Sequence, residues 1–162
     1  MQHSTHCASL RSCRLALAAA VLCGAAPFAW AQFATVPTSA MQGGPKPSAA
    51  AADRDYRVDA ARHVYASFPS RIHKGKLPPL MYAVMITDTE IDATGQVVSV
   101  SVARPPAAAQ EVAPWVVSLI RNAAPFPAPV KLAGSANVIY REIWLVDRTG
   151  QFQVDTLTEG QR

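Results

Sequence analysis

The stretch from Met81 to Arg104, MYAVMITDTEIDATGQVVSVSVAR, decides the fold of this chain. It consists of two runs of strand-forming residues that are joined by four turn formers, Asp-Ala-Thr-Gly, at 92–95. Gly95 can adopt a positive φ angle, and the Asp92 side chain can accept a hydrogen bond from the backbone two residues further on. The stretch therefore predicts a β-hairpin closed by a tight turn.

The two predicted strands differ in how clearly they alternate. On the outgoing strand three valines share one face: Val98, Val100 and Val102. This period of two predicts a sheet with one buried side. On the incoming strand three apolar residues share one face: Tyr82, Val84 and Ile86. Ile91, next to the turn, falls on the opposite face, which either a β-bulge between Ile86 and Ile91 or a long twisted ribbon would explain.

The first 31 residues have the composition of a secretory signal peptide. A polar segment with two arginines precedes an almost wholly apolar run at 15–28, and small residues stand where a signal peptidase reads. We expect cleavage between Ala31 and Gln32. The alternative is an uncleaved single-pass anchor, which the short apolar run and Pro27 disfavour. All the cysteines precede the expected cleavage site, which leaves the mature chain without thiol or disulfide chemistry: Cys7, Cys13 and Cys23.

The charge of the chain is weakly basic, at +4 for 15 basic and 11 acidic residues. Loss of the two arginines in the presequence leaves 13 basic against 11 acidic residues, a formal charge of +2. Such a weak and scattered excess does not favour nucleic acid or an anionic membrane as the partner.

The mature chain divides into a linker and one folded domain. Residues 32–54 are rich in Ala, Pro, Gly and Ser, which predicts a flexible linker. The domain is expected over 55–162. Within it, the basic and Pro-containing link at 70–79 is interpreted as a solvated loop rather than a binding patch.

Two helices are predicted in this domain. The first covers Tyr56–Phe68, where apolar side chains recur at helical spacing, and Pro69 ends it. The second follows the hairpin and runs toward Ala124. We interpret Pro114 as its first residue, because proline lacks the N–H that a helix interior needs. The alternative is an earlier start at Pro106 with a kink at Pro114.

The chain after the second helix predicts an extended segment and a third strand. The segment consists of Pro125, Phe126 and Pro127, and is expected to hold the phenylalanine against the fold. Residues 138–146 place apolar side chains on both faces of a strand, which is typical of a central position in a sheet.

A second turn with the chemistry of the first is predicted near the C-terminus. Asp147 and Gly150 have the same spacing as Asp92 and Gly95, and a glutamine follows each glycine. This similarity predicts a second hairpin whose outgoing strand lies within 152–157.

The chemistry-bearing side chains do not form a catalytic pattern. His63 and His73 are the only histidines after residue 31, and neither has a Cys, Glu or second His at ligand spacing, so we expect no metal and no cofactor. Three acids share a face of the incoming strand: Asp88, Glu90 and Asp92. We interpret them as solvated charges near the turn rather than an acid–base pair. With no phosphate-binding loop and no nucleophile elbow either, we expect no catalytic residue and no enzyme.

The order of these elements resembles the TonB C-terminal domain family, which includes TolA-like relatives. Three blocks carry the resemblance: IDATGQV at 91–97, Val-x-Val-x-Arg at 100–104, and AAPFPAP at 123–129. It extends over about Tyr56–Val146. The resemblance implies an α+β fold with two helices packed on one face of a small antiparallel sheet of three to four strands. In such a fold the strand after the second helix lies beside the first strand of the hairpin.

The resemblance also implies a periplasmic protein-interaction module. Such a module binds an extended segment of a partner, for example an outer-membrane receptor or another cell-envelope protein, as an added strand at a sheet edge. Two alternatives are an energy transducer anchored in the inner membrane and a structural protein that forms a homodimer. The short linker, and an apolar segment without histidine, disfavour a complete transducer. The candidate partner-binding residues belong to the two possible edges: Val98, Val100 and Val102 on one, Phe152 and Val154 on the other.

Overall fold

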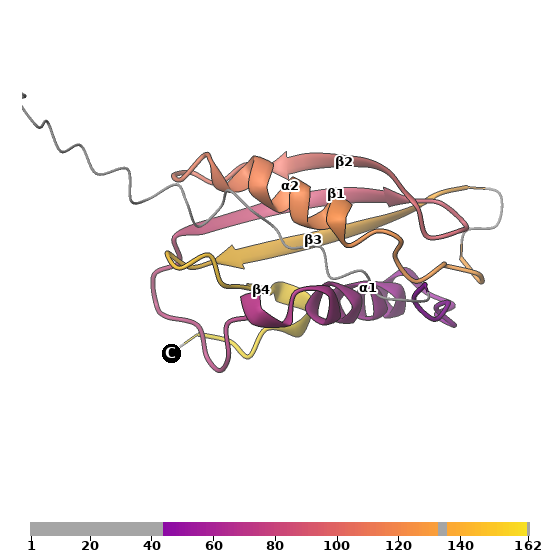
Figure 1. Cartoon of the computed structure of the whole chain (residues 1–162), viewed down its shortest axis with the longest axis horizontal. Helices are drawn as coiled ribbons and strands as arrows, with labels where there is room; N and C mark the ends of the chain where they lie inside the picture. The colour runs from indigo at the N-terminus through magenta and orange to yellow at the C-terminus, as the bar shows by residue number, and fades with distance from the viewer. Residues whose placement is uncertain (1–43, 133–135, 162) are drawn as a thin grey trace, which may run out of the picture.

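The computed structural model describes residues 44–132 and 136–161, which Figure 1 draws in colour. The expected signal peptide at 1–31, the cleavage site between Ala31 and Gln32, and the linker as far as residue 43 lie outside the described residues. The α+β class is confirmed by two helices and one antiparallel sheet within the described part of the chain.

The sheet has four strands in the order β2-β1-β3-β4, so that β2 and β4 form its edges (Figure 1). All three neighbouring pairs are antiparallel, and the predicted third strand is central and lies beside β1. Short 3₁₀ turns, η2 and η3, follow α1 and β4. The bounds of the elements are α1 Asp53–Ser67, η2 Pro69–Arg71, β1 Ala83–Ile91, β2 Val97–Arg104, α2 Val112–Asn122, β3 Val138–Val146, β4 Phe152–Val154 and η3 Asp155–Leu157.

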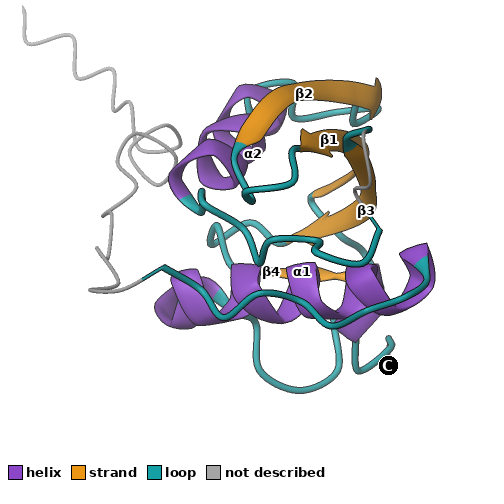
Figure 2. Cartoon of the chain, turned by 90° about the vertical axis from the view of Figure 1, so that its right-hand side faces the viewer, coloured by secondary structure: helices purple, strands orange, loops and turns teal. Residues whose placement is uncertain are grey.

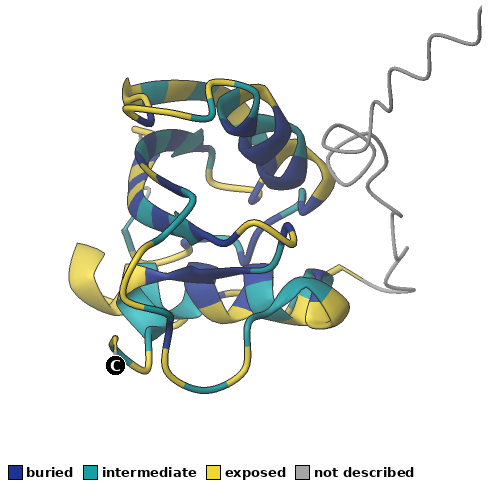
Figure 3. Ribbon diagram, turned by 90° about the vertical axis from the view of Figure 1, so that its left-hand side faces the viewer, coloured by how far each residue is buried: buried dark blue, intermediate teal, exposed yellow. Residues whose placement is uncertain are grey.

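One hydrophobic cluster joins both helices to one face of the curved sheet (Figures 2 and 3). On β1 the buried residues alternate: Ala83, Met85, Thr87, Thr89 and Ile91. The expectation that Tyr82, Val84 and Ile86 define the apolar face is therefore wrong. Val84 is 38% exposed, and β1 keeps one phase along its length and an unbroken register with β3. Threonine can occupy the core face here because Trp144 Nε1 donates to Thr87 Oγ1 at 3.0 Å.

The irregularities that the sequence indicated in the incoming strand lie instead in β2. Its register with β1 shifts between Ile86 and Thr87 and between Glu90 and Ile91, and each shift leaves one β2 residue without a partner. These two residues are Ala103 and Val98, so both are bulged. The bulge removes Val98 from the face that Val100 and Val102 share, and Val98 is 55% exposed.

Both helices begin at other residues than predicted. α1 starts at Asp53 rather than Tyr56, because its first turn is exposed and carries none of the apolar stripe that marks the helix. α2 starts at Val112, which makes Pro114 its third residue and not its first. No kink is needed, because the first four N–H groups of a helix have no acceptor within the helix.

The folded part of the chain extends upstream of α1. Ser48 is buried; its N–H donates to the carbonyl of Ala128 at 3.0 Å, and its Oγ donates to Asp59 Oδ2 at 2.6 Å. These bonds fix the chain around Ser48 against α1 and the segment that follows α2. The expected linker at 32–54 is therefore too long at its C-terminal end.

Both predicted turns form with the same bonds. In the first, Asp92 Oδ1 accepts hydrogen bonds from the N–H groups of Thr94 and Gln96 at 2.8 and 2.9 Å. In the second, Asp147 Oδ1 accepts the equivalent bonds at 2.8 and 3.1 Å. The glycines of the two turns, Gly95 and Gly150, have φ angles of 90° and 76°.

The predicted extended segment is tied to the first turn and to α1. The N–H of Phe126 donates to the carbonyl of Gly95 at 2.8 Å, and the Phe126 side chain is 1% exposed. The peptide bond before Pro125 is cis. The hydroxyl of Tyr56 donates to the carbonyl of Pro127 at 2.9 Å. Together these bonds set where α2 ends relative to the hairpin.

Candidate functional site

The chain closes one edge of its sheet with its own residues. The link between α1 and β1, here called the strap (residues 69–77), runs along the outside of β4 and forms a parallel bridge between Ile72 and Phe152. The N–H of His73 donates to the carbonyl of Phe152 at 3.0 Å, and the N–H of Val154 donates to the hydroxyl of Tyr65 at 3.2 Å. Phe152 and Val154 are both fully buried. The β4 edge is therefore occupied, and a strand could add there only by displacing the strap.

The side chain of Gln153 reinforces this closure. Its Nε2 donates to the carbonyls of His73 and Gly75 at 2.9 and 2.7 Å. Its Oε1 accepts from Thr158 Oγ1 at 2.9 Å and from the N–H of Glu159 at 3.1 Å. One buried amide thus joins the strap to the last residues of the chain, so the basic link is a structural cover for β4 and not only a solvated loop.

A buried carboxylate, which sequence reasoning missed, holds the segment after β4. Glu142 on β3 is fully buried, with Arg57 Nη2 3.7 Å from its Oε1. It accepts hydrogen bonds from the N–H groups of Ile143 and Thr156 at 3.1 and 3.3 Å and from the Tyr140 hydroxyl at 3.0 Å. Burial and the neighbouring carboxylate raise the pKa of Tyr140 well above its ordinary value. The available signal was position, since Glu142 shares its strand phase with apolar residues on both sides.

The opposite edge, β2, is open. Among the described residues β2 pairs only with β1, and no bridge or backbone hydrogen bond from another segment reaches its outer side. Between the bulges at Val98 and Ala103 lies a regular stretch, 99–102, in which Ser99 and Ser101 are exposed. The outward N–H and C=O groups of such an edge are available to another strand.

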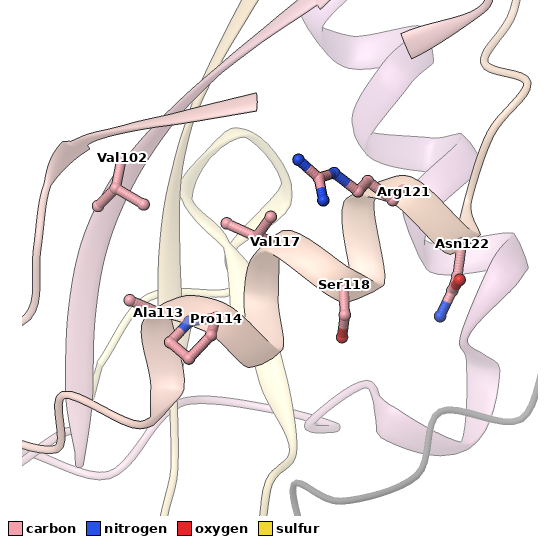
Figure 4. Close-up of a pocket in the computed structure, with 7 residues that line it drawn as sticks. All are labelled: Val102, Ala113, Pro114, Val117, Ser118, Arg121 and Asn122. Carbon is pink, nitrogen blue, oxygen red and sulfur yellow. The ribbon is translucent and has the colours of Figure 1, made fainter. Parts of the chain in front are cut away.

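A groove of about 560 Å³ lies between this edge and α2 (Figure 4). Its apolar lining includes Val102 from β2 and Val117 from α2. The remaining lining residues all come from α2: Ala113, Pro114, Ser118, Arg121 and Asn122. The candidate partner-binding residues Val100 and Val102 are half-buried and pack against the core, so they support the groove while the strand backbone forms its rim.

Helix α2 has two functional faces. One carries the buried residues of the core, namely Val112, Trp115, Val116, Leu119 and Ile120. The other carries the groove residues, which recur three and four positions apart. Sequence reasoning placed Val117 with the core stripe, although it lies on the groove face and is half-buried.

The acidic residues of the hairpin are each engaged by a partner. Arg141 donates to Asp88 through Nε and Nη2 at 2.7 and 2.6 Å, and these bonds lower the pKa of Asp88. Hydrogen bonds from Asn137 and Ser99 lower the pKa of Glu90. Each carboxylate is thus stabilised in its ionised form. A general acid would need a raised pKa, so this group offers no acid–base pair.

The two histidines have structural partners. His63 is 8% exposed, its Nε2 lies 2.7 Å from the carbonyl oxygen of Ala123, and burial lowers its pKa. His73 Nδ1 lies 2.9 Å from Asp147 Oδ2. Over residues 44–132 and 136–161, no group of three or more potential ligands is placed to hold a metal ion. In the same residues, no helix combines the length and the apolar character required to cross a bilayer.

Comparison of the chain with protein-family models, with curated proteins and with solved structures finds no match. The functional argument therefore depends on the geometry of the two edges and on the resemblance noted in the sequence.

Proposed function

We propose that this protein is a periplasmic interaction module that binds an extended segment of a partner protein as an additional strand along β2. The observation that carries the proposal is the contrast between the edges. Hydrogen bonds within the chain cover β4, whereas β2 is open along a regular stretch and borders a partly apolar groove.

Strand addition suits these features for a physical reason. Main-chain hydrogen bonds to the 99–102 stretch supply affinity, and alternate side chains of the added strand point toward the groove, where Val102 and Val117 can contact them. The bulges at Val98 and Ala103 limit the regular pairing surface to a short segment. This favours recognition of a short peptide over unlimited edge-to-edge association.

The resemblance to the TonB C-terminal domain family supports the same function and suggests its cellular setting. In that family an extended segment of an outer-membrane transporter adds to a sheet edge. The signal peptide expected at 1–31 supports export to the periplasm, where the partner would be an outer-membrane receptor or another cell-envelope protein. Sequencing the N-terminus of the mature protein tests this setting, because a start at Gln32 contradicts the anchored-transducer alternative.

Site-specific photocrosslinking tests the proposed edge. A photoreactive benzoylphenylalanine is introduced at Ser101, on the open edge, and in a control variant at Arg62, which is exposed on α1. After irradiation of cells that export the protein, we expect a heteromeric adduct from Ser101 and none from Arg62. Mass spectrometry then identifies the crosslinked segment. Adducts only between two copies of this chain would instead indicate the homodimer, and equal adducts from both variants would contradict binding at β2.

A further inference from the structure

We propose that the segment bound along β2 carries an acidic side chain that pairs with Arg121. This inference rests on the proposed function and adds the chemistry of the partner. Arg121 is the only charged residue that lines the groove, and it lies in the last turn of α2. In Figure 4 its side chain extends from the helix on the side of Val117 and Val102.

Nothing acidic in the described part of the chain neutralises this guanidinium. The carboxylates that form ion pairs there bond to other residues, and Glu111, just before α2, instead accepts a hydrogen bond from the Tyr82 hydroxyl at 2.6 Å. A guanidinium presents a fixed fork of donors that suits a carboxylate, and it is only weakly hydrated for a cation. An exposed arginine beside apolar side chains therefore selects for an anionic group on the occupant of the groove.

The chain's own N-terminal segment does not have this chemistry. Residues 1–52 contain no Asp and no Glu, so an upstream segment that folded back into the groove could not supply the acid. Charge complementarity therefore points to a separate protein with an extended, largely apolar segment that contains one acidic residue.

Synthetic peptides can test this pairing on the full protein. A set of eight-residue peptides alternates Val and Thr and carries one Glu, one Gln or one Lys at matched positions that are moved along the peptide. Amide chemical shifts of the ¹⁵N-labelled protein report both affinity and location. We expect shifts along β2, with Glu peptides binding about two- to fivefold more tightly than Gln peptides, the range of an exposed ion pair, and Lys peptides binding most weakly.

Two variants separate the charge effect from folding. In Arg121→Gln the preference for Glu over Gln should disappear, and in Arg121→Glu the order should reverse in favour of Lys. Arg62→Gln, which removes the same charge from α1, should leave the preference unchanged. Higher ionic strength should reduce the preference of the unmodified protein.

The possible failures are distinguishable. Peptides that shift the β2 amides equally whether they carry Glu or Gln would overturn the acidic partner while strand addition at β2 stands. Peptides that leave the β2 amides unshifted at every position of the charge would overturn strand addition itself, and the acidic partner with it.

Discussion

Replacing Gly95 with alanine tests whether the first turn and the segment after α2 hold each other in place. Gly95 has a φ of +90°, and a Cβ added to it would lie 2.1 Å from the carbonyl oxygen of Phe126. Contacts shorter than 3.0 Å are essentially never seen for Cβ atoms, so the Phe126 backbone must move. That movement stretches the hydrogen bond from the Phe126 N–H to the Gly95 carbonyl, now 2.8 Å long.

The expected destabilisation is the sum of three effects. A non-glycine residue in the left-handed region costs about 1–2 kcal/mol. A weakened backbone hydrogen bond costs about 1 kcal/mol. Phe126 is 1% exposed, and loosening its packing adds roughly 1–2 kcal/mol, a fraction of the cost of deleting a buried phenylalanine. Gly95→Ala should therefore lower the free energy of unfolding by about 3–5 kcal/mol, much of what a small domain has.

Urea unfolding followed by the fluorescence of the buried Trp115 and Trp144 measures this loss. Gly75→Ala is the matched control, because Gly75 has a φ of +79° but a Cβ added to it would have no neighbouring atom within 4 Å. The control should lose only the backbone part, about 1–2 kcal/mol. If the two variants lose the same free energy, the contact between Gly95 and Phe126 does not contribute the stability that we assign to it.

Two further predictions concern buried ionisable residues. Glu142→Leu should lower the free energy of unfolding by about 3–5 kcal/mol, because the N–H of Thr156 and the guanidinium of Arg57 lose their partner; hydrogen exchange should accelerate most at 152–157, and uniform acceleration would contradict this. Since burial lowers the pKa of folded His63, protons bind the unfolded chain more tightly, and stability should fall as pH drops below about 6.5. His63→Gln should flatten that dependence between pH 7.5 and 5.5 in urea titrations.

The sequence predicts the parts of this fold that depend on local chemistry. Both Asp-x-x-Gly turns form because an aspartate and a glycine with positive φ satisfy the turn by themselves. The α+β class and the central third strand follow from the order and apolar content of the segments. These features need no knowledge of distant neighbours.

The features that sequence reasoning missed depend on contacts between distant segments. β1 buries Thr87 because a tryptophan on β3 donates a hydrogen bond to it, and no rule of alternation within β1 contains that information. The bulges at Val98 and Ala103 are defined only by the register against β1. The closure of β4 involves the strap, 69–77, some 80 residues earlier in the chain. Sequence analysis could therefore name both edges as candidates but could not choose between them.

The difference between the edges is itself an argument for a binding role at β2. An exposed edge strand invites aggregation, and proteins commonly blunt such edges with Lys or Pro, or cover them. This chain covers β4, a strand of three residues, with the strap and with a buried glutamine. β2 has eight residues, VVSVSVAR, without a Lys or Pro, and the described residues leave its outer side uncovered. Bulges near both of its ends limit self-association yet preserve a regular stretch beside the groove, as selective pairing with a short strand requires.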